Sequence, residues 1–427
     1  MSAIIKSAPR KLLVASFVAA LCGRPAYAQI ASGGDTILFR TDAAGVRTEP
    51  QYQGKPLTIG PAQATVALSA RLVADSNIFR TSKSANDDIY LEVAPSVRIA
   101  AGFGAHSATL SARASTRRHA RFSSEDRSVI DVNYAGRIDL GPQSAASFRT
   151  AFVRESEQRG SVGGNRLGSG PAIVQRYESS WSASTEFGRM GLSVLAGIAQ
   201  RSHNPLDLAN GTAISQSFRD TKTVRVAPRL NVRAGPSATI FVGGSASRTR
   251  SIDRSQGALR DASGYTLLAG VRSDAEGLIV GEVGIGWRGQ NYRNTAFRDF
   301  TGLTYDATVD WYPTRLVSLR VQAGQDIVNS NFASVAGIVR RYAGATFYYD
   351  PLRNLRFVAV IEREHDDFRE LKLSTSTTST GLTARYQIGR HVDFSVFGRV
   401  ISKTSSNILF VDRYNSAAAG IALTGTL

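Results

Sequence analysis

The chain has 427 residues, a formal net charge of +17 and one cysteine, Cys22. A single cysteine excludes an internal disulfide framework and a zinc site made of several thiolates. A basic balance suits nucleic acid, an anionic membrane surface or an anionic solute, but the basic residues are scattered and the secretion signal described next makes nucleic acid an unexpected partner.

The N-terminus has the pattern of a secretory signal peptide. Basic residues within 6–11 precede an apolar run at 12–21, and Ala26-Tyr27-Ala28 has the small-x-small form of a cleavage site. We therefore predict that residues 1–28 are removed. Cleavage would remove Cys22 and lower the net charge from +17 to +13, because the segment carries four basic residues and no acid. No later segment reaches 18 consecutive apolar residues, so no membrane-spanning helix is expected.

Residues 29–63 differ in composition from everything that follows. They are polar and rich in Gly and Pro, with "SGGD", "TEPQYQGKP" and "IGPAQ", which predicts an irregular periplasmic extension. From residue 64 to residue 427 the chain is one series of alternating apolar and polar residues. We assign that series to a single barrel domain.

The stretch from Thr301 to Gly324 shows the alternation clearly. One parity is apolar, and the other is polar or charged: Leu303, Tyr305, Ala307, Val309 and Trp311 against Thr304, Asp306, Thr308 and Asp310. Successive side chains point to opposite faces of a β-strand, so this pattern predicts strands with one apolar and one hydrated face. Similar alternation recurs at 89–99, 130–140, 279–288 and 355–362.

Two kinds of connection separate the strands. Eight short turn signals occur: "GFGAH" (102–106), "LGPQS" (140–144), "FGRMG" (187–191), "AGPSA" (234–238), "SDAEG" (273–277), "YPTR" (312–315), "DPLRN" (350–354) and "IGRH" (388–391). Longer polar connections lie between them, for example at 75–88, 156–171, 202–216 and 252–263. The eight turns join sixteen strands, and one strand precedes and one follows them, which predicts eighteen. A lost hairpin near 156–216 would make the number sixteen.

Short turns that alternate with long loops are typical of outer-membrane barrels, whose turns face the periplasm and whose loops face outward. A closed barrel also satisfies every backbone polar group inside a bilayer. A soluble sandwich alternates too, but it uses shorter strands at a spacing of about 8–12 residues. We therefore predict an all-β fold, a transmembrane antiparallel β-barrel. Its aromatic residues near strand ends, among them Trp181, Trp287, Trp311, Tyr265, Tyr342 and Tyr348, are expected in interfacial girdles.

One stretch resembles a known family. "ADSNIFRTSKSANDDIYLEVAPSVRI" (74–99) is similar to the start of the putative β-barrel porin 2 family of Gram-negative bacteria, through its Asp75–Arg80 loop and its Val93-Ala94-Pro95 strand. The following "STRRHARFSSEDRSVIDVNYAGRIDL" also looks like that family. The resemblance implies an outer-membrane barrel without catalytic residues. Some members are encoded with exopolysaccharide synthesis and export machinery, so it implies that context and those partners as well.

Residues that would carry catalysis are scarce. None of the five histidines has metal-ligand spacing. The cluster "EREHDDF" (362–368) is the one group that suits a hydrolase at the barrel rim, but a solvated loop stem is the favoured explanation for it. We expect no enzyme activity, no cofactor and no metal.

Arginine is frequent on the parity that we assign to the lumen. The predicted pore-lining residues are Arg225, Arg229, Arg233, Arg137, Arg288, Arg320, Arg356, Asp306 and Asp310. Arg225, Arg229 and Arg233 recur every four residues, about 13 Å apart along a strand, with no acid between them. Lumenal acids are expected to be fewer than the basic residues, which would leave a positive lumen of the kind that anion pores have.

We therefore expect passage of hydrophilic, preferentially anionic, solutes or polymer across the outer membrane of a Gram-negative bacterium. A non-conducting barrel that acts through its long loops is the alternative, and a hydrolase is the least favoured function. The expected partners are outer-membrane lipid and the barrel-assembly machinery. The pattern does not give the oligomeric state.

Overall fold

The computed structural model describes residues 43–47, 49–83, 85–161, 168–255, 260–273, 278–407, 411 and 413–427. The predicted signal peptide lies outside these residues. The helices are single 3₁₀ turns: η2 (Pro50–Tyr52), η3 (Ser123–Glu125), η4 (Ser217–Arg219) and η5 (Arg369–Leu371). No helix in the described part of the chain is long and apolar enough to cross a membrane.

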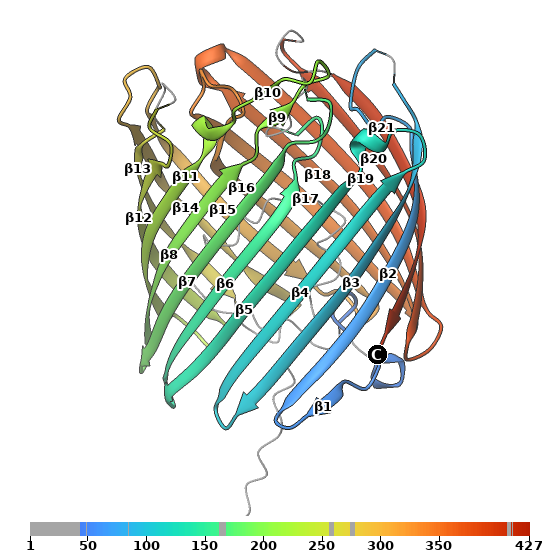
Figure 1. Ribbon diagram of the computed structural model, residues 1–427. Coiled ribbons are helices and arrows are strands. Elements are labelled where there is room, and N and C mark those ends of the chain that lie inside the picture. Colours follow the sequence, from blue (N-terminus) through green and yellow to red (C-terminus); the bar gives the residue numbers. More distant parts are fainter. Residues whose placement is uncertain are drawn as a thin grey trace, which may run out of the picture.

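Eighteen long antiparallel strands and the short β1 (Leu57–Ile59) form one sheet that closes on itself (Figure 1). Pairing of the first long strand with the last, from Ala67 opposite Thr426 to Asp75 opposite Ala418, closes the barrel. The long strands are β2 (Ala62–Asp75), β3 (Asp88–Phe103), β4 (His106–His119), β5 (Arg127–Gly141), β6 (Ser144–Ser156), β7 (Ile173–Phe187), β8 (Met190–His203), β11 (Thr221–Arg233), β12 (Ala238–Ser251), β13 (Ala262–Ser273), β14 (Ile279–Tyr292), β15 (Phe300–Trp311), β16 (Val317–Asn329), β17 (Gly337–Leu352), β18 (Leu355–Phe368), β19 (Leu373–Gln387), β20 (Val392–Ser405) and β21 (Tyr414–Thr426).

The eight predicted turns separate the strand pairs as expected, although residues 274–277 of the fifth turn lie outside the described part of the chain. The hairpin β7–β8 is intact between its two long loops. The structure therefore confirms eighteen strands and rules out sixteen. The first long strand begins at Ala62, two residues before the predicted boundary, because Ala62 and Gln63 already pair with Ala101 and Ala100 of β3.

All short turns lie at one end of the barrel and the longer connections at the other (Figure 1). We call these the turn end and the loop end. The C-terminus lies at the turn end, where Leu427 exchanges two backbone hydrogen bonds with Val66. The loop end includes the small hairpin β9 (Leu206–Asp207) and β10 (Ala213–Ile214).

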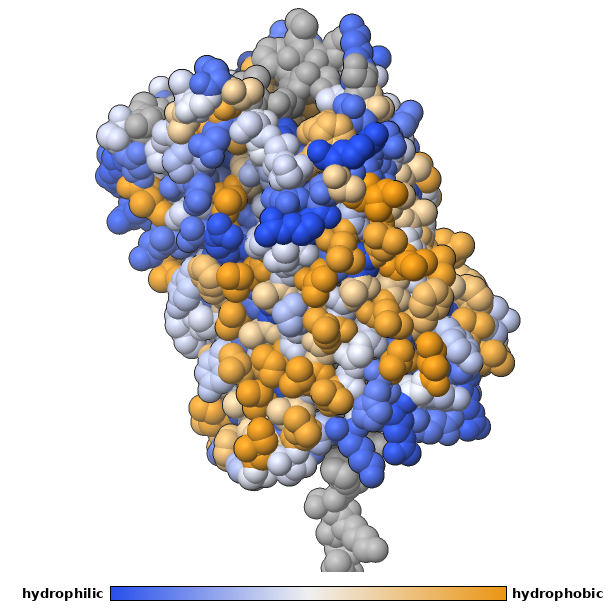
Figure 2. Space-filling model, turned by 45° about the vertical axis from the view of Figure 1, so that its right-hand side comes forward, coloured by the Kyte–Doolittle hydropathy of each residue, from blue (hydrophilic) through white to orange (hydrophobic). Residues whose placement is uncertain are grey.

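The two parities of each strand face opposite sides of the wall, as predicted. On β15, Leu303 and Trp311 are 55% and 46% exposed on the outside, whereas Asp310 is 4% exposed on the inside. Figure 2 shows the resulting hydrophobic surface over the middle and lower part of one face, with hydrophilic residues above it. Trp181, Trp287 and Tyr265 lie on this outer surface. The girdle prediction is wrong for Tyr342 and Tyr348, which share the inward parity of Asp350.

Candidate pore lining

All nine predicted pore-lining residues lie on the inward-facing parity of their strands. The positions are Arg137 on β5, three arginines on β11, Arg288 on β14, Asp306 and Asp310 on β15, Arg320 on β16 and Arg356 on β18. Their outward neighbours are exposed apolar residues such as Val226, Leu230 and Ile138. Period-2 alternation was therefore sufficient to find which face each residue occupies.

The row on β11 is partly neutralised by acids from other strands. Arg229 forks onto Glu282 of β14, with Nη1–Oε1 and Nη2–Oε2 distances of 2.8 and 2.6 Å. Its guanidinium also lies 3.9 Å from the ring centroid of Phe241. Arg233 lies 3.7 Å from Glu186 of β7, and both side chains are more than half exposed. The absence of an acid between Arg225 and Arg233 in the sequence therefore did not mean an unpaired row.

Arg225 differs from the other two arginines of β11. Its Nη2 donates a 3.0 Å hydrogen bond to the hydroxyl of Ser245 on β12. No ion pair joins Arg225 to a described residue. It also lines a hollow in the inner wall that three glycines, Gly243, Gly244 and Gly284, help to form. Arg225 is thus the arginine of this row whose charge is least compensated.

Most other predicted residues are members of ion pairs within the wall. Three pairs join neighbouring or nearby strands, Arg320–Asp310 (2.7 Å), Arg356–Asp350 (2.8 Å) and Arg288–Asp326 (3.0 Å), and a fourth, Arg137–Asp139 (2.7 Å), lies within β5. Asp306 instead accepts a 3.4 Å hydrogen bond from the hydroxyl of Tyr342. These pairs use both oxygens or nitrogens in a fork where geometry allows, which fixes the wall as well as balancing its charge.

Sequence analysis missed several inward-facing acids. They are Asp75, Asp88, Glu178, Asp326, Asp350, Glu364 and Asp366. Inward cations such as Arg117, Arg176 and Arg340 were missed as well, so the basic residues still outnumber the lumenal acids slightly, as predicted. The signal was present, because each of these acids continues the parity of its strand. The strands are simply longer than the segments first assigned to them.

Charge is nevertheless unevenly distributed around the wall. The inward faces of β8, β11, β12 and β13, all fully described, carry Arg201, Arg225, Arg229, Arg233 and Arg272 and no carboxylate. The inward faces of β15 to β18 carry seven acids: Asp306, Asp310, Asp326, Asp350, Glu362, Glu364 and Asp366. We call these the basic arc and the acidic arc. A single strand, β14, lies between them.

A segment before the barrel lies along the inner wall at the turn end. Ala43 packs against Val280 and Tyr312. The Ser318 hydroxyl donates to the Ala44 carbonyl at 2.7 Å, and the Arg356 guanidinium donates to the Arg47 carbonyl at 3.1 Å. Because Ser318 and Arg356 are inward-facing, residues 43–47 occupy the inside of the barrel mouth. This part of the predicted 29–63 extension is therefore held by the wall.

Loops from several strands meet along the inner rim of the loop end. Arg159 forks onto Glu125, and Lys403 of β20 donates to the Gly160 carbonyl at 2.6 Å. Arg219 binds Glu157 at 2.5 and 3.0 Å. His203 lies 2.9 Å from Asp220. Burial raises the pKa of the Asp220 carboxyl to about 6 and raises the pKa of Glu157 as well.

The cluster "EREHDDF" does not assemble into one site. It lies on β18, where Glu362, Glu364 and Asp366 face inward and Arg363 and His365 face outward. The pleat therefore separates the acids from the histidine. Among the described residues, no group of three His, Cys, Asp or Glu side chains is placed to hold a metal ion.

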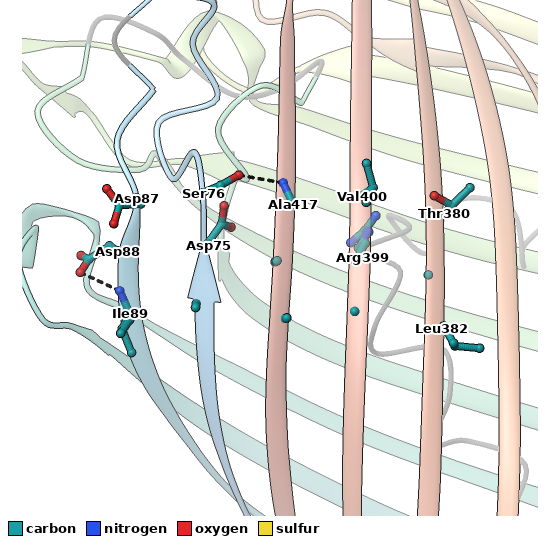
Figure 3. A pocket seen from close by; sticks show the side chains of 15 residues that line it. Asp75, Ser76, Asp87, Asp88, Ile89, Thr380, Leu382, Arg399, Val400 and Ala417 are labelled. Carbon is teal, nitrogen blue, oxygen red and sulfur yellow. Dashed lines mark hydrogen bonds between the residues drawn. The ribbon is translucent and has the colours of Figure 1, made fainter.

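The outer wall has a shallow hollow where the barrel closes. Small side chains of β2, β20 and β21 leave it open between the larger Ile89, Leu382 and Val400 (Figure 3). Asp75 and Arg399, which are labelled in the same view, belong to the inward parity. At the top of this seam the Ala417 amide donates to the Ser76 hydroxyl at 2.9 Å.

A closed barrel of eighteen long strands, with an apolar outer belt, a charged inner face and short turns at one end only, defines an outer-membrane β-barrel protein. The turn end then lies in the periplasm and the loop end outside the cell. A family model described as putative beta-barrel porin 2 matches residues 49–424, so the chain belongs to this family. The match supports an outer-membrane channel of a Gram-negative bacterium.

The comparison with solved structures found matches at low similarity. The ferric enterobactin receptor PfeA of Pseudomonas aeruginosa is 7% identical with a TM-score of 0.44, over 88% of this chain and 81% of that chain. OccK2 (OpdF) of Pseudomonas aeruginosa is 13% identical with a TM-score of 0.44, over 85% and 98%. The siderophore receptor PiuA of Acinetobacter baumannii is 10% identical with a TM-score of 0.43, over 87% and 82%. No curated protein matches the chain.

Proposed function

We propose that the barrel is a water-filled channel that passes hydrophilic solutes or polymer and prefers anions. The observation that carries this proposal is the basic arc, four consecutive strands whose inward faces carry five arginines, on β8, β11 and β13, and no carboxylate. Arginine lining is the means by which anion and phosphate pores select. Barrels of 16–18 strands enclose an aqueous channel unless a segment fills it.

Within the basic arc, Arg225 is the proposed selectivity residue. Arg229 is 8% exposed and engaged by Glu282, so its charge is compensated and its main role is to brace the wall. Among the described residues, the guanidinium of Arg225 has only a neutral hydroxyl as its hydrogen-bond partner. A guanidinium can fork onto the oxygens of a passing carboxylate or phosphate. Arg225 therefore offers the stronger contact to an anionic solute.

A passage linked to exopolysaccharide export is the narrower form of this proposal. Its support is the family, because the resemblance of residues 74–99 implies a context in which some members are encoded with exopolysaccharide synthesis and export machinery. A barrel that does not conduct and acts through its loops is the competing function. Its support is that residues 43–47 lie on the inner wall at the turn end and that loops meet along the inner rim of the loop end.

Single-channel recording in planar bilayers tests the proposal. Stepwise conductance is expected, and a silent barrel under all voltages would favour the non-conducting function. The reversal potential under a salt gradient should show anion preference. That preference should weaken as salt rises, because the screening length falls from about 10 Å at 0.1 M to about 3 Å at 1 M.

Two matched variants locate the selectivity. Arg225→Gln should move the reversal potential toward cation preference. The double variant Arg229→Gln with Glu282→Gln removes a positive and a negative charge together and should leave the reversal potential unchanged. A native preference for cations, or an unchanged potential in Arg225→Gln, would overturn Arg225 as the selectivity residue.

A further inference from the structure

Charged residues on the outer face of the wall occur only near the loop end. In the described strands, the outward parity carries seven cations, Arg118, Arg154, Lys222, Arg248, Arg250, Arg341 and Arg363, and one carboxylate, Asp367. Each lies in the half of its strand nearest the loop end. The outward parity toward the turn end carries none in these strands. The outer faces of the strands therefore differ in charge between their loop-end and turn-end halves.

The densest group lies on β11 and β12. Lys222 is directly opposite Arg250, and Arg248 is opposite Val224, one pair further down. All three side chains are exposed. No side-chain hydrogen bond or ion pair joins any of them to a described residue. We call Lys222, Arg248 and Arg250 the outer basic patch.

This arrangement is unfavourable without an anion. Side chains directly opposite in an antiparallel pair have Cβ atoms about 4.5–5.5 Å apart, and like charges there are destabilising. The acids of the loops above are already engaged: Asp261 accepts the Ser251 amide at 2.8 Å, and Asp253 accepts the Ser217 hydroxyl at 2.7 Å. An anion from outside the chain would therefore relieve the repulsion within the patch.

The position of the patch defines the kind of ligand. Val224, which is opposite Arg248, and Val226 next to it on β11 are exposed apolar residues, and Val242 and Ile240 continue the apolar surface further toward the turn end on β12. Tyr265 of β13, 45% exposed, pairs with Ala246 one step below Arg248. Aromatic girdles mark the interface of a membrane. The patch thus lies at headgroup height, with a strip for acyl chains beneath it.

We propose that the outer basic patch binds the phosphate groups of a phosphorylated lipid in the outer leaflet. Arg248 and Arg250 supply planar forks that match phosphate oxygens, and Lys222 adds a third positive charge. The exposed Gln200 and Ser263, which pair with Lys222 and Arg248, flank the site with further polar groups. Because the patch faces away from the lumen, this binding is independent of channel function.

Native mass spectrometry of the purified barrel in detergent tests the proposal. The probe is a diphosphorylated glucosamine lipid with acyl chains, and the comparison probe is the same lipid without phosphates. The native chain should retain the phosphorylated lipid. The variant Lys222→Gln, Arg248→Gln, Arg250→Gln should bind it roughly 100-fold more weakly, since each cation near an anionic surface contributes about fivefold.

The matched control removes three exposed cations at the turn end: Lys55→Gln, Arg189→Gln, Arg353→Gln. It should bind the lipid as the native chain does, and all three proteins should show the same heat-dependent gel shift, which reports a folded barrel. Equal binding by the patch variant, an equal loss in the control, or equal binding of the lipid without phosphates would each overturn the proposal. So would displacement of the lipid by inorganic phosphate at equal concentration, because that outcome indicates a free phosphate site.

Discussion

Basic residues occur on both the inner and the outer face of the barrel wall, but their surroundings differ. Inward arginines occur along the full height of the wall, and many are fixed by carboxylates, as Arg320 is by Asp310 at 2.7 Å. Outward cations are confined to the loop end, and Lys222 and Arg250 oppose each other without a carboxylate between them. The comparison teaches that the wall tolerates a charged side chain only where water, a counter-ion or a lipid headgroup is within reach. Moving a charge by one residue along a strand moves it to the opposite face and so changes which of these it meets.

The sharpest test of this comparison replaces each of two neighbouring aliphatic residues in the middle of β18 with arginine, in separate variants. Ile361 is 51% exposed on the outer face, whereas Val360 faces inward on the same parity as Glu362. Ile361→Arg should prevent assembly, because arginine near the bilayer midplane costs about 2–4 kcal/mol. Val360→Arg should assemble, since the lumen hydrates it. The heat-dependent gel shift of membrane fractions measures assembly, and equal failure of both variants would contradict the assignment of faces.

On the inner face, a buried ion pair should stabilise the fold more than an exposed one. The Asp310 side chain is 5% exposed beside Arg320, whereas Asp139 and Arg137 are 29% and 55% exposed. Asp310→Asn should lower the free energy of unfolding by about 1–3 kcal/mol, because a neutral amide with one acceptor oxygen replaces the buried carboxylate that accepts two hydrogen bonds from Arg320. Asp139→Asn should lower it by less than about 1 kcal/mol. Denaturant titration of the barrel in detergent gives both values, and similar losses would mean that the lumen screens the two pairs alike.

The loop end should respond to pH through Asp220, for which the smallest effect is expected. Burial raises the pKa of Asp220 to about 6, and nearby Asp253 also raises it. A raised carboxyl pKa stabilises the folded loop below the ordinary pKa and loses that contribution as pH rises through 6. Protection of the 204–220 amides from hydrogen exchange should therefore fall between pH 5 and 7.

Asp220→Asn serves as the control for this prediction, measured at each pH beside the native chain. It should keep at pH 7 the protection that the native chain has at pH 5, because the amide carries no charge. The groups around Asp220 are His203, Arg219 and Asp253. Equal pH dependence in the variant would assign the effect to one of these or to Glu157.

The features that the sequence predicted are those that depend on residues close together in the chain. The strand sequence, the eight turns, the closed barrel and the inward position of Arg225 and Asp310 followed from local alternation. The outward position of Arg248 and Arg250 follows from the same parity. It was not predicted, because alternation leads one to expect an apolar outer face. The inward acids of β16 to β18 were missed because strand ends are the least certain feature of a period-2 pattern.

The sequence by itself determined the side of the wall on which each residue lies, because alternation is a property of a single strand. Only the tertiary structure decided which charges meet. The bond from Arg229 to Glu282 joins residues 53 apart, and the bond from Gly45 to Asp350 joins residues 305 apart. Such contacts depend on register and on closure of the whole barrel. Strand pairing fixes register between segments that are distant in the chain, so no local pattern could have placed residues 43–47 inside the turn end or opposed Lys222 to Arg250.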